Sequence, residues 1–191
     1  MDTNRLAKEL REIAGDTKSG VTVTVLGDDL GHMQGTLLGP DETPYEGGTF
    51  HVDIQLTDAY PFEPPKMRFM TKVWHPNVSS ANGAICLDIL KEQWSPALSI
   101  KTAMLSLQAL LSSPEPSDPQ DAVVAKQYTS DHEEFKTTAK AWTVKYASAN
   151  AKDEKLDRLM EMGFKENQAR AALGRAAGDE QQALELLLTG L

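Results

Sequence analysis

The sequence predicts an α+β fold followed by a smaller helical domain. Four segments with apolar residues at alternate positions cluster between residues 21 and 70, as in a β-meander. Helical patterns come before and after this cluster, so strands and helices are segregated along the chain and do not alternate as in a parallel βαβ array. The last forty residues, which follow a small polar run, contain three more short helical patterns.

The first helix is expected over residues 3–14. Leu6, Leu10 and Ile13 fall at i, i+4 and i+7 and form one apolar stripe, and Gly15 ends the run. We expect the opposite face to be polar, and it carries the charged residues Arg5, Lys8, Glu9 and Glu12.

Four strands of an antiparallel sheet should follow this helix. Their alternating patterns lie at 21–26, 32–38, 49–56 and 66–70. The proline cluster YPFEPP (60–65) predicts a rigid loop, because proline fixes φ and has no backbone donor. Residues 71–98 show little regular pattern but are rich in apolar side chains, which favours an ordered, functional loop over disorder.

Helices are expected again from residue 100. Ser99 can cap a helix over 100–112, a second helix fits 121–128, and Asp131 with Glu134 resembles a capping box that opens a helix to about residue 146. The predicted domains are a core over 1–148, a linker over 149–152 and a helical module over 153–191.

Composition limits the classes of function. Hydrophobic residues make up 40% and charged residues 25%, as in globular proteins, and the net charge of −9 argues against a general nucleic-acid binder. We expect no signal peptide and no membrane span, because no apolar run is suitable. One cysteine cannot form an internal disulfide, so a reducing compartment, cytoplasm or nucleus, is the simplest expectation.

That cysteine, Cys86, allows four interpretations. It can be a buried apolar side chain, a protease-type nucleophile, a metal ligand or a carrier thiol. A turn signal at Asn82-Gly83 places it in a setting that a purely structural cysteine does not need. Asp88 is the nearest charge in sequence and should raise the thiol pKa, which favours a carrier over an activated nucleophile.

The alternatives to a carrier have weaker support. The four histidines are dispersed, and no protease-like motif surrounds the cysteine. One cysteine and dispersed histidines also lack the ligand spacing of a zinc site, and there is no glycine-rich phosphate loop, so no metal or nucleotide cofactor is expected.

Several tracts around Cys86 occur together in a specific order. They are PYEGGTFHVDI (44–54), YPFEPP (60–65), His75-Pro76-Asn77 nine residues before the cysteine, Trp94-Ser95-Pro96 after it, and Ser117-Asp118-Pro119. In these tracts residues 1 to about 150 resemble the ubiquitin-conjugating enzymes. The tail resembles a ubiquitin-associated (UBA) domain through Met162-Gly163-Phe164 and Leu187-Leu188, where Gly163 fits a left-handed helix C-cap.

The resemblance implies a mechanism. Cys86 would accept ubiquitin as a thioester from the activating enzyme, which uses the ATP, and pass it to lysine amines, building polyubiquitin chains for proteasomal degradation. Asn77 would stabilise the oxyanion or hold the loop, and both roles stay open. Asp118 would orient the acceptor lysine, with a helix N-cap as the alternative, and Asp88 could contact the acceptor. His75 and Pro76 would be structural.

The resemblance also implies partner surfaces on what we expect to be a monomer. Arg5 and Lys8 match positions that meet the activating enzyme, although a solvated helix face is the simpler interpretation. Residues that match a docking patch for RING-type ligases are Phe62, Pro96 and Ala97. The residues expected to bind ubiquitin through the UBA domain are Met162, Gly163, Phe164 and Leu188.

Two other classes of function compete with a catalytic carrier. A non-catalytic ubiquitin-binding adaptor could keep the same fold, but such a protein would be expected to lack the cysteine. A carrier of another ubiquitin-like modifier would use the same chemistry, and the ubiquitin-binding tail argues against it.

Overall fold

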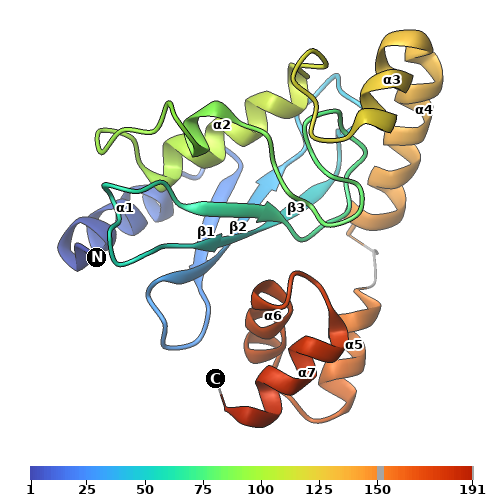
Figure 1. The fold of residues 1–191 in the computed structure, drawn as a ribbon. Coiled ribbons are helices and arrows are strands. Elements are labelled where there is room, and N and C mark those ends of the chain that lie inside the picture. Colours follow the sequence, from blue (N-terminus) through green and yellow to red (C-terminus); the bar gives the residue numbers. More distant parts are fainter. Residues whose placement is uncertain (150–152, 191) are drawn as a thin grey trace.

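The computed structural model describes residues 1–149 and 153–190. The first part forms an α/β unit and the second a bundle of three short helices, as Figure 1 shows. The predicted linker, 149–152, lies outside the described residues except for Ala149. Among the described helices none is long and apolar enough to cross a membrane.

A four-stranded antiparallel sheet forms the centre of the first unit. Its strands β1 (Val21–Val25), β2 (His32–Leu38), β3 (Thr49–Gln55) and β4 (Lys66–Phe69) pair in sequence order, which confirms the predicted meander. One face of the sheet is apolar and buried, with Met33 and Leu37 from β2 beside Phe50 and Ile54 from β3. The opposite face carries polar side chains at the alternate positions, as a two-residue period requires.

Helices cover the apolar face. Helix α2 (Ile100–Ser112) packs on it so closely that a Cβ at Gly35 would lie 2.6 Å from the Met104 side chain. Helix α1 (Thr3–Gly15) contributes Leu6 and Ile13 to the same core. A glycine in the middle of β2 therefore allows the helix to approach the sheet.

One prediction for α1 is wrong. Glu9 does not lie on a solvated face but is only 6% exposed, because Tyr60 and the start of α2 supply hydrogen-bond donors that satisfy its carboxylate. Lys8 and Glu12 are exposed, as expected.

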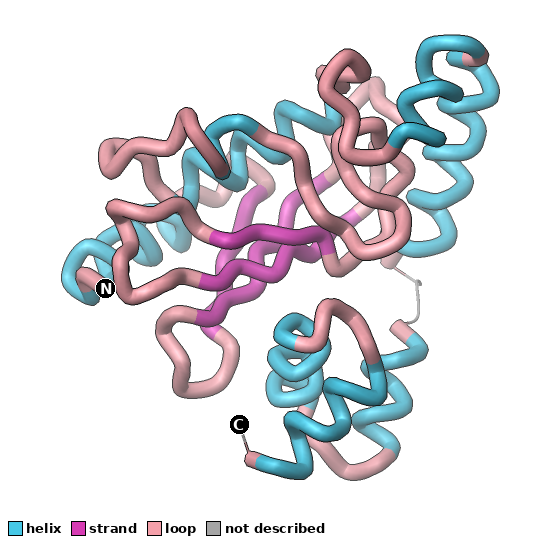
Figure 2. Tube along the Cα trace, in the orientation of Figure 1, coloured by secondary structure: helices cyan, strands magenta, loops and turns pink. Residues whose placement is uncertain are grey.

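The long segment between β4 and α2 is mostly loop, drawn in pink in Figure 2. Its one regular element is the short 3₁₀ helix η1 (Asp88–Leu90). Side chains along it, including Trp74, Ile85 and Trp94, pack against the core, so the predicted ordered loop is confirmed.

The remaining core helices are α3 (Ala122–Ser130), α4 (His132–Trp142) and the π-helical turn η2 (Thr143–Ala147). Ser99 caps α2 through Thr102 N, as predicted. Asp131 caps α4 through Glu134 N, but its own backbone N–H donates to Gln127 O, so only half of the expected capping box forms.

The C-terminal module contains α5 (Glu154–Glu161), α6 (Glu166–Arg175) and α7 (Glu180–Thr189) around its own apolar core. Gly163, at φ +97°, ends α5 in a left-handed conformation. The N–H groups of Gly163 and Phe164 donate to Met160 O and Leu159 O, which is the Schellman pattern. The predicted C-cap is confirmed.

Helix α6 of this module lies on the polar face of the sheet, opposite α2 (Figure 1). Arg68 donates to Gly174 O, and Arg175 pairs with Asp29 at 2.8 Å. A Cβ at Gly174 would lie 2.3 Å from Asp53 Oδ1, so a glycine is what allows α6 to meet the buried His32–Asp53 pair.

Candidate active site

Cys86 lies at the end of a short, tightly turned loop that begins at the HPN tract. Val78 pairs with Ile85, and Cys86 N donates to Asn77 O at 2.9 Å. The chain reverses at Gly83, whose φ is +76° and where a Cβ would lie 1.9 Å from Phe69 O. The predicted turn is confirmed, because only glycine fits both the backbone angle and the close approach.

Two opposite charges flank the Cys86 thiol, which is partly buried. The thiol donates to Asp118 Oδ2 at 3.4 Å, and Lys91 Nζ lies 3.7 Å from Sγ. Burial raises the pKa of the Cys86 thiol, the carboxylate of Asp118 raises it further, and the charge of Lys91 partly offsets both. The thiol is therefore mostly protonated at neutral pH, and this environment does not activate it.

Asn77 is almost completely buried, and its side chain amide is fully hydrogen-bonded. Oδ1 accepts from Glu115 N at 2.8 Å, and Nδ2 donates to Glu115 O at 2.8 Å and to Asp118 O at 2.9 Å. A primary amide has two hydrogens, and both are used here. This arrangement, which we call the Asn77 cluster, holds the loop that carries Asp118 beside the thiol.

His75 and Pro76 are buried and structural in their contacts. His75 Nε2 donates to Leu110 O at 2.9 Å, and Nδ1 accepts from Asn77 N at 3.0 Å. Burial lowers the pKa of His75 to about 4, so the ring is neutral near pH 7 and has no free nitrogen to act as a base. Pro76 O accepts from the backbone N–H groups of Gln120 and Asp121.

The two aspartates proposed to act on the acceptor lysine, Asp118 and Asp88, lie differently with respect to the thiol. Asp121, not Asp118, caps α3 by accepting from Val123 N and Val124 N, so the alternative role considered for Asp118 belongs to its neighbour. The Asp118 side chain is left to face the thiol. Asp88 is exposed at the start of η1, and its carboxylate accepts from Ile89 N, with no hydrogen bond to Cys86.

The residues proposed for partner surfaces differ in exposure. Phe62 is 79% exposed, and Pro96 and Ala97 are exposed on a neighbouring loop. Lys8 is exposed, and its ammonium group lies 4.0 Å from the Glu12 carboxylate. Arg5 is instead partly buried and donates to Glu9 and to two carbonyl groups of the chain itself.

In the C-terminal module some of the ubiquitin-binding candidates are exposed, and others contribute to the structure of the module. Met162 is 57% and Leu188 71% exposed, and Phe164 is half-buried. Leu187, next to Leu188, packs against the core of the module. Gly163 shapes the backbone between α5 and α6.

The sequence alone did not predict that Lys91 approaches the thiol. Lys91 is five residues from Cys86, and η1 folds the chain back so that its amine reaches Sγ. A signal for a short helical turn over residues 88–91 would have suggested it. Over residues 1–149 and 153–190, no group of three acidic, histidine or cysteine side chains is arranged to hold a metal ion.

The chain matches two protein-family models. Residues 5–143 match the model of the ubiquitin-conjugating enzymes, and residues 152–187 match the UBA/TS-N domain. Over nearly their full lengths, "Ubiquitin-conjugating enzyme E2 27" of Arabidopsis thaliana is 55% identical (98% of each chain) and "Ubiquitin-conjugating enzyme E2 K" of Homo sapiens is 45% identical (97% of this chain, 96% of that protein).

A solved structure supports the same assignment. The E2 domain of a Toxoplasma gondii ubiquitin-conjugating enzyme superimposes with a TM-score of 0.74 at 52% identity, covering 78% of this chain and all of that chain. The matches cover the catalytic tracts around Cys86 and the helical tail together. The chain therefore belongs to the ubiquitin-conjugating enzyme family and carries a C-terminal UBA domain.

Proposed function

We propose that this enzyme carries ubiquitin as a thioester on Cys86 and transfers it to lysine amines to build polyubiquitin chains that direct proteins to the proteasome. The observation that carries the proposal is the placement of the partly buried Cys86 thiol 3.4 Å from Asp118, on a loop held by the Asn77 cluster. Transfer through a thioester is the general function of the family.

Charging exchanges one thioester for another. The Cys86 thiolate attacks the carbonyl carbon of ubiquitin bound to the activating enzyme, the old C–S bond breaks, and the enzyme's own C–S bond forms. A substrate that is already activated does not need a strongly acidic thiol, and a raised thiol pKa protects the free enzyme from unwanted alkylation.

Discharge transfers the acyl group to nitrogen. A lysine amine attacks the thioester carbonyl, the C–S bond breaks, an isopeptide bond forms, and Cys86 regains its proton. The amine must first lose a proton. The position of the Asp118 carboxylate, 3.4 Å from Sγ, supports a role in orienting the ammonium and assisting this loss. Because both hydrogens of the Asn77 amide are used, we assign Asn77 to holding the loop.

Exposed side chains support the partners expected for this family. RING-type ligases dock on Phe62, Pro96 and Ala97. The activating enzyme binds the exposed face of α1 that carries Lys8. The enzyme works as a monomer in the cytoplasm and nucleus and needs no bound cofactor, because the activating enzyme uses the ATP. The UBA surface around Met162 and Leu188 holds a ubiquitin and so raises its local concentration near the thioester.

Two reconstitution assays test the proposal. With ubiquitin, activating enzyme and ATP, we expect a covalent adduct that thiol reductant removes and that Cys86→Ala lacks. With a RING ligase added, we expect chains whose length falls in Met162→Ala/Leu188→Ala, while charging is unchanged. No adduct with a folded enzyme would contradict the carrier role, and equal chains in the UBA variant would contradict its part in chain growth.

A further inference from the structure

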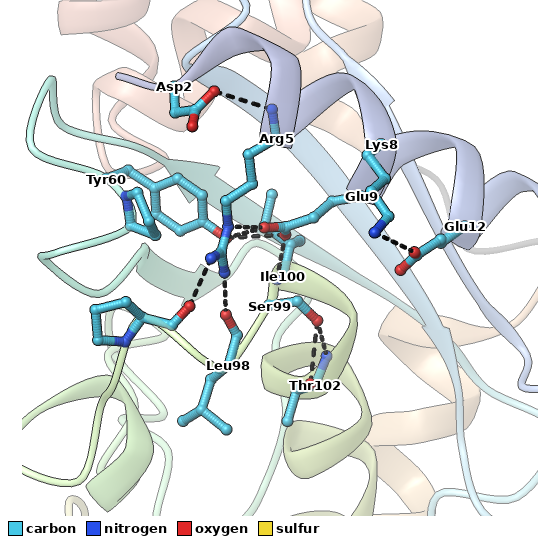
Figure 3. Close-up of polar contacts among 12 residues, drawn as sticks. Asp2, Arg5, Lys8, Glu9, Glu12, Tyr60, Leu98, Ser99, Ile100 and Thr102 are labelled. Atoms are coloured by element: carbon cyan, nitrogen blue, oxygen red, sulfur yellow. Dashed lines mark hydrogen bonds and ion pairs between the residues drawn. The ribbon is translucent and has the colours of Figure 1, made fainter.

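A cluster of hydrogen-bonded polar groups around the buried side chain of Glu9 links α1 to both loops that carry the proposed ligase-docking residues. We call it the Glu9 cluster. It consists of the side chains of Arg5, Glu9 and Tyr60 and the backbone groups of Pro96, Leu98 and Ile100 that they contact, most of which are labelled in Figure 3. The reaction described above uses none of these side chains, so the burial of the two acidic and phenolic groups, Glu9 and Tyr60, needs another explanation.

The Glu9 carboxylate is the centre of the cluster. Its two oxygens accept from Tyr60 Oη at 2.9 and 2.8 Å, from Arg5 Nε at 2.8 Å and from Ile100 N at 2.9 Å. Burial and the neighbouring carboxylate raise the pKa of Tyr60, so its hydroxyl stays protonated and donates. The acceptor is therefore well satisfied in a place where an unpaired carboxylate would be costly.

From this centre, two side chains reach the two docking loops. Tyr60 begins the proline cluster, two residues before the exposed Phe62. Arg5 uses its other nitrogens to donate to Pro96 O and Leu98 O, each at 2.5 Å, and so holds the backbone on both sides of Ala97. The two loops also contact each other, since Trp94 Nε1 donates to Pro61 O at 2.8 Å.

The arrangement gives the docking surface a fixed shape before any partner arrives. Exposed loops normally lose conformational freedom on binding, and pre-ordering them reduces that cost. We propose that Glu9 and Tyr60 are positioning residues for ligase docking, which hold the Phe62 loop and the Pro96–Ala97 loop at their working separation. The proposal rests on the docking role assigned above to Phe62, Pro96 and Ala97.

The test compares discharge with and without a ligase. The enzyme is charged with ubiquitin, the activating enzyme is stopped, and discharge to free lysine is followed alone and with increasing amounts of a RING domain that stimulates the wild type. The variants are Tyr60→Phe, which removes one hydroxyl group, and Glu9→Gln. The matched control is Glu12→Gln, an exposed acid on the same helix.

We expect ligase-free discharge and the maximal stimulated rate to stay near the wild-type values for Tyr60→Phe. The half-saturating RING concentration should rise about fivefold, the size expected for loss of one buried hydrogen bond. Glu9→Gln should act in the same direction and combine non-additively with Tyr60→Phe, because the two residues share one cluster. Glu12→Gln should behave as the wild type.

Phe62→Ala separates this inference from the function on which it rests. If Phe62→Ala weakens the RING response and Tyr60→Phe does not, the positioning role is contradicted and the docking surface stands. If Phe62→Ala has no effect, the docking surface fails and the inference fails with it. A Tyr60→Phe variant that loses ligase-free discharge in parallel would show a general structural role and would also contradict the inference.

Discussion

Two neighbouring parts of the active site differ in how tightly they are held. The Asn77 amide is 1% exposed, and both of its hydrogens and its oxygen are hydrogen-bonded. Nine residues on, the partly buried Cys86 thiol has two polar side-chain contacts among the described residues, to Asp118 at 3.4 Å and to Lys91 at 3.7 Å. Three side-chain hydrogen bonds therefore hold the loop behind the thiol, whereas the proposed acceptor sulfur has only longer polar contacts.

The largest effect should come from the fixed part. Asn77→Ala removes three hydrogen bonds from a buried side chain and leaves Glu115 N and Asp118 O without that partner, so we expect the free energy of unfolding to fall by about 2–4 kcal/mol. Discharge to lysine should fall sharply, because the loop carrying Asp118 is released. Urea denaturation and single-turnover discharge measure the two effects.

Asn82→Ala is the matched control for this experiment, since Asn82 is an exposed asparagine in the same loop whose side chain accepts one bond, from Ala84 N. Its stability should stay close to that of the wild type. Equal losses in the two variants would show that the Asn77 cluster has no special role.

Asp118→Asn should affect the thiol and the acceptor in opposite directions. Loss of the negative charge lowers the pKa of Cys86, so alkylation by iodoacetamide at pH 7 should become faster. Discharge to lysine should become roughly tenfold slower or more, because the amine loses its orienting carboxylate. The control is Glu92→Gln, which changes an exposed acid. If the alkylation rate and the discharge rate of Asp118→Asn changed in the same direction, the role assigned to Asp118 would be contradicted.

The smallest effect should come from Lys91. Lys91→Met removes the positive charge near Sγ and raises the pKa of Cys86, so alkylation at pH 7 should slow by about two- to threefold, a modest change because the lysine is exposed. Lys91→Arg keeps the charge and should stay near the wild-type rate. A faster rate in Lys91→Met would mean that the lysine does not act on the thiol through its charge.

The sequence could predict what depends on local pattern. Periodicity located the helices and strands, and residue type located the caps at Ser99 and Gly163. The HPN tract, Cys86 and the Asp118 tract were found because their order along the chain is itself distinctive. These features depend on side chains near one another in sequence, or on a motif with fixed spacing.

What the sequence could not predict depends on distant partners. Glu9 is buried because Tyr60, 51 residues away, donates to it, and an acid on a helix gives no sign of such a partner. The Asn77 amide donates to backbone carbonyl groups 38 and 41 residues away, which the sequence does not reveal. The packing of α6 on the sheet depends on Gly174, because a side chain there would clash with Asp53. The sequence does not show that Asp53 lies opposite this glycine.

In the proposed function Cys86 is a carrier thiol that its surroundings do not activate. The most direct measurement is its pKa, from the rate of iodoacetamide alkylation as a function of pH, with Cys86→Ala as the blank. We predict a pKa above the ordinary cysteine value of about 8.5. A pKa below about 7.5, as in thiols activated by a neighbouring cation or helix terminus, would contradict the account.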